Sequence, residues 1–229
     1  MRNEESTMQK FDTAAPVSAV LDVPAGRILL IAADRADTVV EVLPANASKR
    51  RDVTAAEEIE VTYDNGVLRI GTPAPKNQYF GPSGSVEVTV KLPAGSSVTA
   101  KTAGAEFRAV GRLGDVAFEG AQGDVKVDEA ASVRLTAFVG DVSVGRLGGP
   151  AQISTQKGDI RVTEAVHGTV VLSTQMGDVS VGAAHGVSAA LDAGTGYGRI
   201  HNSLRNTDGT PGLTIHATTG HGDITARSL

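Results

Sequence analysis

The sequence predicts an all-β fold: a β-solenoid, β-helix- or β-roll-like, built from two-strand coils of about 20 residues, with an antiparallel β region capping one end. Three observations support this fold class. Gly accounts for 27 of the 229 residues and aromatic residues for only 3%, a composition that suits closely stacked backbone. Apolar and polar residues alternate with a period of two through much of the chain. A Gly-Asp phrase also recurs from about residue 114 onward.

The first element is a polar tail. Residues 1–11 read MRNEESTMQKF and lack the apolar segment of a signal peptide. No stretch of the sequence approaches the roughly 20 apolar residues that span a bilayer. We therefore expect a flexible tail, no membrane span and a cytoplasmic location.

Residues 12–100 predict an antiparallel region of strands joined by tight turns. Pro-Ala-Gly at 24–26 separates two alternating runs, and the same three residues recur at 93–95. Asp-Asn-Gly at 64–66 also lies between alternating runs, and Asn-Gly in that position is the strongest local signal of a β-hairpin. We expect this region to cap one end of the solenoid.

Two intervals within this region predict loops. Residues 46–58 carry Lys-Arg-Arg at 49–51 and then two Glu, which we interpret as solvated, mutually offset charges rather than an anion-binding patch. Residues 72–84 hold three Pro together with Tyr79 and Phe80. We expect these two rings to anchor the loop to the core, and a ligand-stacking platform is the alternative.

Residues 101–229 predict the solenoid repeats, which we expect to join the preceding region in one structural unit over residues 12–229. The phrase Gly-Asp-Val/Ile-x-Val and its weaker copies place successive glycines from Gly123 onward 17, 18, 19, 21 and 24 residues apart. Each unit contains two short alternating runs and no helical pattern, which is typical of a β-solenoid. A single unit cannot bury its apolar side, so the units stack and each coil contacts its neighbours.

The turns of these coils account for the candidate site residues, and their role is structural. Gly at the corner supplies a positive φ, and the Asp that follows is expected to bond the backbone of its own turn. Residues two and four after each Gly would point inward in stacked rows, and the wider final spacings predict an irregular terminal cap. The turn residues are Gly123, Gly140, Gly158, Gly177, Gly198, Gly222, Asp124, Asp141, Asp159, Asp178, Asp223, Thr155, Thr174, Thr195 and Thr219.

These units resemble the β-strand-repeat domains of a bacterial family of putative adhesins, a domain-of-unknown-function family. The resemblance rests on the Thr-x-x-Gly-Asp-Ile/Val-x-Val phrases and the Pro-Ala-Gly and Asp-Asn-Gly turns before them, and it covers roughly residues 12–229. It implies a fold and brings no catalytic or binding residues with it. A surface adhesin needs an export signal, so the polar residues 1–11 favour an internal scaffold or interaction role.

The titratable residues suggest no metal site or cofactor. Stacked corner Asp residues would lie about 4.8 Å apart, and a cation would relieve their repulsion. However, Arg199 interrupts this row, and the Gly-Gly-x-Gly-x-Asp nonapeptide of calcium-loaded β-rolls is absent. We interpret the row as turn formers and the histidines as solvated turn residues. The histidines are His167, His185, His201, His216 and His221.

Composition argues against several function classes. The absence of Cys excludes disulfides, thiolate catalysis and Cys-zinc sites, and a net charge of −5 argues against nucleic acid as a partner. Outward positions alternate among Ser, Thr, Lys and Arg without the grouped carboxylates of a polysaccharide-cleaving enzyme, so no catalytic residue is assigned. The sequence therefore predicts a non-catalytic scaffold or protein-interaction module that presents a flat, polar sheet face to a protein partner or to its own kind.

Two alternatives remain open at this stage. The first is a cell-surface adhesin or carbohydrate-binding protein, which export of the native protein would support. The second is a self-assembling filament that grows by end-to-end stacking, which concentration-dependent growth would support.

Overall fold

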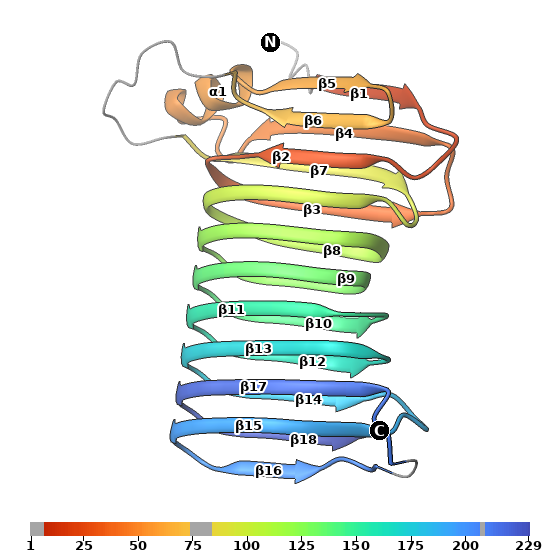
Figure 1. Ribbon diagram of the computed structural model, residues 1–229. Helices are drawn as coiled ribbons and strands as arrows, with labels where there is room; N and C mark the ends of the chain where they lie inside the picture. Colours follow the sequence, from red (N-terminus) through yellow and green to blue (C-terminus); the bar gives the residue numbers. More distant parts are fainter. Residues whose placement is uncertain (1–6, 74–83, 207–208) are drawn as a thin grey trace.

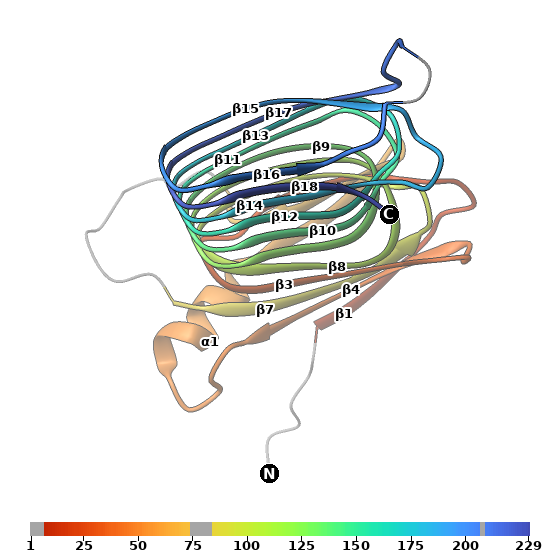
Figure 2. The ribbon, with the colours of Figure 1, turned by 90° about the horizontal axis from the view of Figure 1, so that it is seen from below.

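The computed structural model describes residues 7–73, 84–206 and 209–229, and it shows a stack of flattened coils (Figure 1). Each coil contributes one strand to each of two facing sheets, which we call sheet I and sheet II (Figure 2). The β-solenoid predicted from the repeat is confirmed. The side chains enclosed between the sheets form one continuous apolar core.

The two sheets divide the strands as follows. In spatial order, sheet I contains β1 (Thr7–Asp12), β4 (Asp37–Pro44), β7 (Val86–Pro93), β3 (Ala25–Ala33), β10 (Val142–Leu147), β12 (Ile160–Ala165), β14 (Val179–Ala183), β18 (Ile224–Ser228) and β16 (Ile200–Ser203). Sheet II contains β5 (Glu60–Asp64), β6 (Val67–Gly71), β2 (Ser18–Asp22), β11 (Ala151–Lys157), β13 (Gly168–Met176), β17 (Leu213–His221) and β15 (Ala189–Tyr197). Two long strands, β8 (Ser97–Gln122) and β9 (Val125–Val139), bend between the sheets and belong to both.

The positions predicted to point inward form stacked rows in the core. In sheet I, Val125 pairs with Val142 and Val142 with Ile160, and the row continues through Val179 and Ile224. All five residues are at most 1% exposed. Because parallel strands in register place equivalent positions above one another, the repeat in the sequence becomes a column of branched side chains.

The N-terminal strands close one end of the stack, but they are not all antiparallel. The hairpin predicted at residues 64–66 is confirmed, since β5 and β6 pair antiparallel, as do β1 with β4 and β4 with β7. In contrast, β2 and β3 lie in different sheets, and both pair in parallel with β8. The turn at residues 24–26 is therefore a corner of a coil and not a reversal between neighbouring strands. Turn residues specify a change of direction, but they do not specify which strand becomes the neighbour.

A helix replaces one of the two expected loops. Residues 46–58 contain α1 (Arg50–Glu57), which packs beside β4 and β7. Its sequence is rich in the helix formers Arg, Ala and Glu. Asp52 in its first turn is 3% exposed and accepts a hydrogen bond from the backbone N–H of Ser85 (3.1 Å). Tyr79 and Phe80 of the other expected loop lie outside the described residues. Within the part of the chain that the structure describes, no helix is long and apolar enough to cross a membrane.

The last two coils stack in an order that differs from their order in the sequence. In sheet II, β13 pairs with β17 and β17 with β15, and in sheet I, β14 pairs with β18 and β18 with β16. The strands of residues 213–228 therefore lie inside the stack, and those of residues 189–203 form its open end (Figure 1).

Side-chain polarity explains this exchange of places. Asn202 in β16 and Ala226 in β18 occupy paired inward positions, yet Ala226 is 0% exposed and Asn202 is exposed. Stacking in sequence order would bury the amide of Asn202, and an unpaired buried amide costs about 1–3 kcal/mol. Of the two last coils expected to form the irregular terminal cap, only the strands of residues 189–203 lie at the end, whereas the coil of residues 213–228 lies inside the stack.

Candidate interaction surface

The corner glycines of the repeat lie directly above one another. Gly158 has a φ of +146°, and a Cβ built on it would lie 2.1 Å from the carbonyl oxygen of Gly140. The equivalent contacts continue along the stack, in the spatial order Gly123, Gly140, Gly158, Gly177, Gly222 and Gly198. The corner excludes any larger residue for two reasons, because the backbone is in the left-handed region and the next coil occupies the space of a side chain.

The sequence predicted that each corner aspartate bonds the backbone of its own turn. The structure shows instead that it bonds the neighbouring coil. The backbone N–H of Asp159 donates to Asp141 Oδ1 (2.8 Å), and that of Asp178 donates to Asp159 Oδ1 (2.8 Å). Asp124, Asp178 and Asp223 accept equivalent bonds from the coil next to them. The carboxylates therefore form a ladder that runs along the corner and fixes the spacing of the coils.

Arg199 ends this ladder. Its backbone N–H donates to Asp223 Oδ1 (2.9 Å), and its guanidinium lies 2.9 Å from Asp223 Oδ2. These two interactions, the backbone bond first, lower the pKa of the Asp223 carboxyl from its usual range. Arg199, which stands in place of an Asp in the sequence repeat, therefore supplies a cation at the end of the Asp ladder. Among the described residues, no group of three or more His, Asp or Glu side chains is arranged to hold a metal ion.

The threonines three residues before the corner glycines link adjacent corners. Thr174 Oγ1 donates to the carbonyl oxygen of Gly158 (3.0 Å), and Thr219 Oγ1 donates to that of Gly177 (2.9 Å). Thr195 makes the same bond to a neighbouring glycine, whereas Thr155 bonds a carbonyl within its own turn. The repeated phrase therefore satisfies buried backbone carbonyls at the corner.

The histidines do not gather at one place in the structure. His216 Nδ1 lies 3.2 Å from Asp192 Oδ2, and the His221 ring stacks on Tyr197 with centroids 4.9 Å apart. His167 and His185 are exposed in the turns at the other side of the coils.

The outer face of sheet I is covered by charged side chains that pair across strands. Arg108 Nη2 lies 2.7 Å from Asp128 Oδ1, and Arg146 contacts both Glu129 and Glu164. Opposite charges on adjacent strands stabilise the sheet by a few tenths of a kcal/mol per pair, about 0.2–1 kcal/mol. Much of the charge on this face is therefore neutralised within the protein.

The outer face of sheet II is hollowed, whereas the repeat had predicted a flat face. Three cavities of about 520, 600 and 250 Å³ lie along β8, β9 and β11, and they extend to β2 and β13. Many of the side chains that line them are small, such as Thr99, Ala117 and Ser154. Small outward residues in the middle of a bent sheet leave a shallow groove, which we call the sheet II groove.

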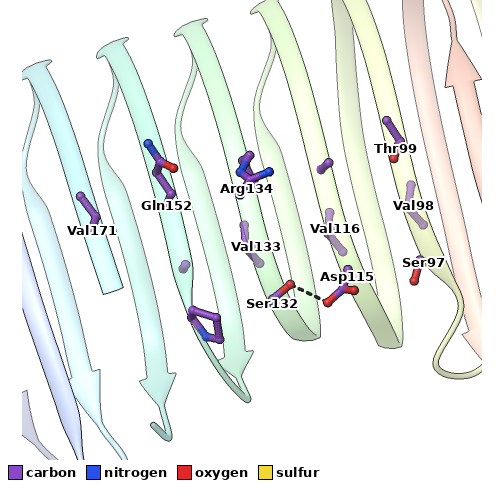
Figure 3. A pocket seen from close by; sticks show the side chains of 13 residues that line it. Ser97, Val98, Thr99, Asp115, Val116, Ser132, Val133, Arg134, Gln152 and Val171 are labelled. Atoms are coloured by element: carbon purple, nitrogen blue, oxygen red, sulfur yellow. Dashed lines mark hydrogen bonds between the residues drawn. The ribbon is translucent and has the colours of Figure 1, made fainter. Parts of the chain in front are cut away.

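The polar residues of the sheet II groove lie on neighbouring strands. Figure 3 shows Arg134 and Gln152 on adjacent strands of the first cavity, with Thr99 farther along it. At its rim, Ser132 Oγ donates to Asp115 Oδ1 (2.6 Å). The side chains of Arg134 and Gln152 are exposed, so their hydrogen-bonding groups are available to a ligand.

Apolar side chains are exposed at two places along the same groove. Val171 is 37% exposed in the first cavity, and Phe138 is 54% exposed in the second. Arg134 is exposed, and among the described residues no carboxylate forms an ion pair with it. The groove thus combines apolar contact area with a cation that has no ion pair, and its lining also includes Asp115 and the ion pair between Lys101 and Glu119.

None of the groove residues belongs to the predicted set of turn residues. Their signal was present in the sequence, because Arg134, Gln152 and Val171 are outward positions of alternating strands. The small neighbours that leave a hollow around them lie on several coils, and the alternation alone does not specify which coils become neighbours.

Parallel two-strand coils with Gly-Asp corners define the class of β-solenoid repeat proteins. Residues 20–227 match the family described as Toastrack DUF4097, and the chain belongs to this family. The resemblance inferred from the repeat phrases is therefore confirmed.

The chain is similar to several solved structures, and the first one named here has the same fold. A putative adhesin from Bacteroides fragilis NCTC 9343 is 15% identical, with a TM-score of 0.60 and 98% of each chain covered. A putative adhesin from Parabacteroides merdae ATCC 43184 is 12% identical, with a TM-score of 0.47 and coverage of 98% of this chain and 97% of that one. A putative lipid binding protein from Parabacteroides distasonis ATCC 8503 is 12% identical, with a TM-score of 0.49 and 97% of each chain covered. At such identities the likeness shows the fold alone, and no curated protein matches the sequence.

Proposed function

We propose that this chain is a non-catalytic interaction module that binds a protein partner in the sheet II groove. The observation that carries this proposal is the combination of a hollowed surface with exposed Arg134, Val171 and Phe138. Arginine and aromatic side chains are enriched where protein interfaces gain most of their affinity. A partner would supply a carboxylate to Arg134 and apolar side chains to the two exposed patches.

The contrast between Arg134 and the ion-paired arginines of sheet I supports this assignment. Arg108 and Arg146 on sheet I already contact carboxylates, and a partner would have to displace those ion pairs. Arg134 on sheet II has no such cost, because its charge is free of intramolecular ion pairs among the described residues. The corner carboxylates bond backbone N–H groups, so they serve the architecture and not an acid–base reaction.

The proposal is tested by placing a photo-crosslinking residue at position 134 and, as a matched control, at Arg161. Arg161 is an exposed arginine on the outer face of sheet I. In the native cells, we expect one protein to crosslink from position 134 and none of it from position 161. Equal crosslinking from both positions, or capture of a polysaccharide instead of a protein, would overturn the proposal.

The purified partner then permits a quantitative test. Arg134→Glu should weaken binding by at least about tenfold in calorimetric titration, as expected for a central interface arginine. Arg161→Glu should leave the affinity unchanged. The cytoplasmic location and the alternative of a carbohydrate-binding adhesin remain predictions, and fractionation of the native cells and binding to glycans would test them.

A further inference from the structure

The two ends of the solenoid are built differently. At the end formed by β1 and β5, the rings of Phe11 and Tyr63 lie 5.4 Å apart and pack on the core. These rings join β1 and β5, the last strands of the two sheets. The helix α1 lies at the same end of the stack (Figure 1). At the opposite end, among the described residues, no pair of aromatic rings joins β15 and β16. There the backbone N–H of Ala189 donates to the carbonyl oxygen of Arg205 (3.0 Å), and Leu204 packs on part of the core. The first end is therefore closed, and the second is open.

The open end exposes backbone and apolar side chains together. β15 pairs with β17 and β16 with β18, so each has one neighbour among the described strands and one free edge. Leu191 and Ala193 point toward the core but are only partly buried, and Ile200 is 44% exposed. An uncovered strand edge with apolar side chains beside it is a template for pairing with another strand.

The charges of this end have opposite signs on its two edges. Asp192, whose side chain is 83% exposed, is the only charged residue of β15. β16 and its flanks carry Arg199, His201 and Arg205, all exposed. Pairing β15 with β15 of another molecule would therefore place acid beside acid, whereas pairing β15 with β16 matches opposite signs.

We propose that the open end binds the open end of a second copy of this chain, forming a closed dimer. A two-fold axis parallel to the strands lays β15 of each copy antiparallel to β16 of the other, so the favourable charge pairing occurs twice. The same contact covers Leu191, Ala193 and Ile200 of both copies. At the other end β1 and β5 also have one strand neighbour each, but Phe11 and Tyr63 pack on the core there. Because the two-fold contact uses both open edges of each molecule, we expect two copies and no filament.

The size of the open end sets the expected strength. The nine residues of β15 span about 30 Å, and two sheets lie about 10 Å apart, so each partner contributes a footprint of roughly 300 Å². Stable complexes bury about 800 Å² per partner. The dimer should therefore be weak and reversible.

Sedimentation of the full chain from about 1 to about 500 µM tests the proposal. We expect a monomer of 23.4 kDa at low concentration and a species of twice that mass at high concentration. Ile200→Lys, which puts a charge on the open edge, should keep the protein monomeric throughout. Met176→Lys is the matched control, since Met176 is 52% exposed in β13, away from the open end, and this variant should dimerise normally.

A charge exchange locates the contact. Asp192→Lys should weaken the dimer at least about tenfold, and combining it with Arg205→Glu should restore most of the affinity, because the opposite signs are re-established. A monomer at every concentration overturns the proposal. Species larger than the dimer overturn the closed pair in favour of a filament, and a dimer that survives Ile200→Lys places the contact elsewhere and also overturns it. Circular dichroism melting of each variant shows that the monomer is folded.

Discussion

The coils of residues 123–183 and those of residues 189–228 share one repeat, yet they stack by different rules. In the first group successive corner glycines are 17 to 19 residues apart, and each coil lies directly on its predecessor in the chain. In the second group the spacing widens to 21 and 24, and the later coil is inserted beneath the earlier one. A longer connection allows the chain to pass over one level and return.

The comparison shows that repeat phrases and stacking order carry separate information. The Gly corner and the inward apolar positions determine that a segment forms a coil. Which coil lies on which depends on burial, because an inner level requires inward side chains that are apolar or, like Thr174, hydrogen-bonded, and the end level does not. Because Asn202 is polar and occupies an inward position, its coil suits the end level and not an inner level.

The largest expected effect comes from a corner glycine in the regular coils. Gly158→Val should reduce the free energy of unfolding by about 3–5 kcal/mol, because the positive φ is strained for valine and its Cβ collides with the carbonyl of Gly140. Gly194→Val at the open end should change it by less than about 0.5 kcal/mol, since a Cβ there meets nothing within 4 Å. Urea unfolding of both variants measures the difference. Similar losses in the two would mean that the glycines do not stack as described.

A second comparison uses one leucine from each region of sheet II. Leu172→Ala should cost about 2–4 kcal/mol, because Leu172 is 0% exposed and its removal leaves a cavity. Leu191→Ala should cost less than about 1 kcal/mol, because Leu191 lies partly exposed at the open end. Chemical unfolding at a protein concentration well below that of dimerisation gives both values. Equal costs would show that the end coil is covered in the monomer.

The third comparison tests the order of the last two coils directly. Ala226→Asn should cost about 1–3 kcal/mol, because it buries an amide inside the stack. Asn202→Ala should change the free energy of unfolding by less than about 0.5 kcal/mol, because Asn202 is exposed. If the coils stacked in sequence order, the two results would be reversed. Thermal or urea unfolding is sufficient to decide between the orders.

Much of the architecture was predictable from the sequence because it is governed by local rules. The corner glycines, the hairpin at residues 64–66 and the buried row from Val125 to Ile224 follow from turn chemistry and alternation. Three features did not follow: the parallel pairing of β2 and β3, the helix α1 and the inserted last coil. The first and the last depend on which distant segment becomes the neighbour, and no local pattern records that choice. The helix does have a local signal in its Arg, Ala and Glu residues, which the charges of this segment obscured.

The candidate surface was predictable only in part, for a similar reason. Alternation places Arg134 and Gln152 on the outside of sheet II, and the repeat predicts a polar face there. The groove itself lies over small residues that come from several coils. The sequence also suggested that each corner Asp bonds its own turn, whereas the close spacing of coils makes the N–H of the next coil the available donor.

The smallest expected effect concerns one carboxylate at each end of the solenoid. The pKa of Asp223 is lowered first by the backbone N–H of Arg199, whereas the pKa of Asp37 is lowered first by the side chain of Arg35 and then by that of Lys10. A carboxyl whose pKa is lower in the folded state stabilises the protein above its unfolded pKa of about 4, and this stabilisation is lost as the pH falls below that value.

Asp223→Asn and Asp37→Asn should therefore each lower the melting temperature at pH 7, and the difference from the original protein should vanish near pH 3. Salt separates the two ends. About 1 M NaCl should reduce the Asp37→Asn effect strongly, because exposed ion pairs are screened, and should leave most of the Asp223→Asn effect, because its main partner is a backbone N–H. Equal salt sensitivity in calorimetric melting would show that Asp223 acts mainly through the guanidinium of Arg199, and the Asp ladder would then contribute little at the open end.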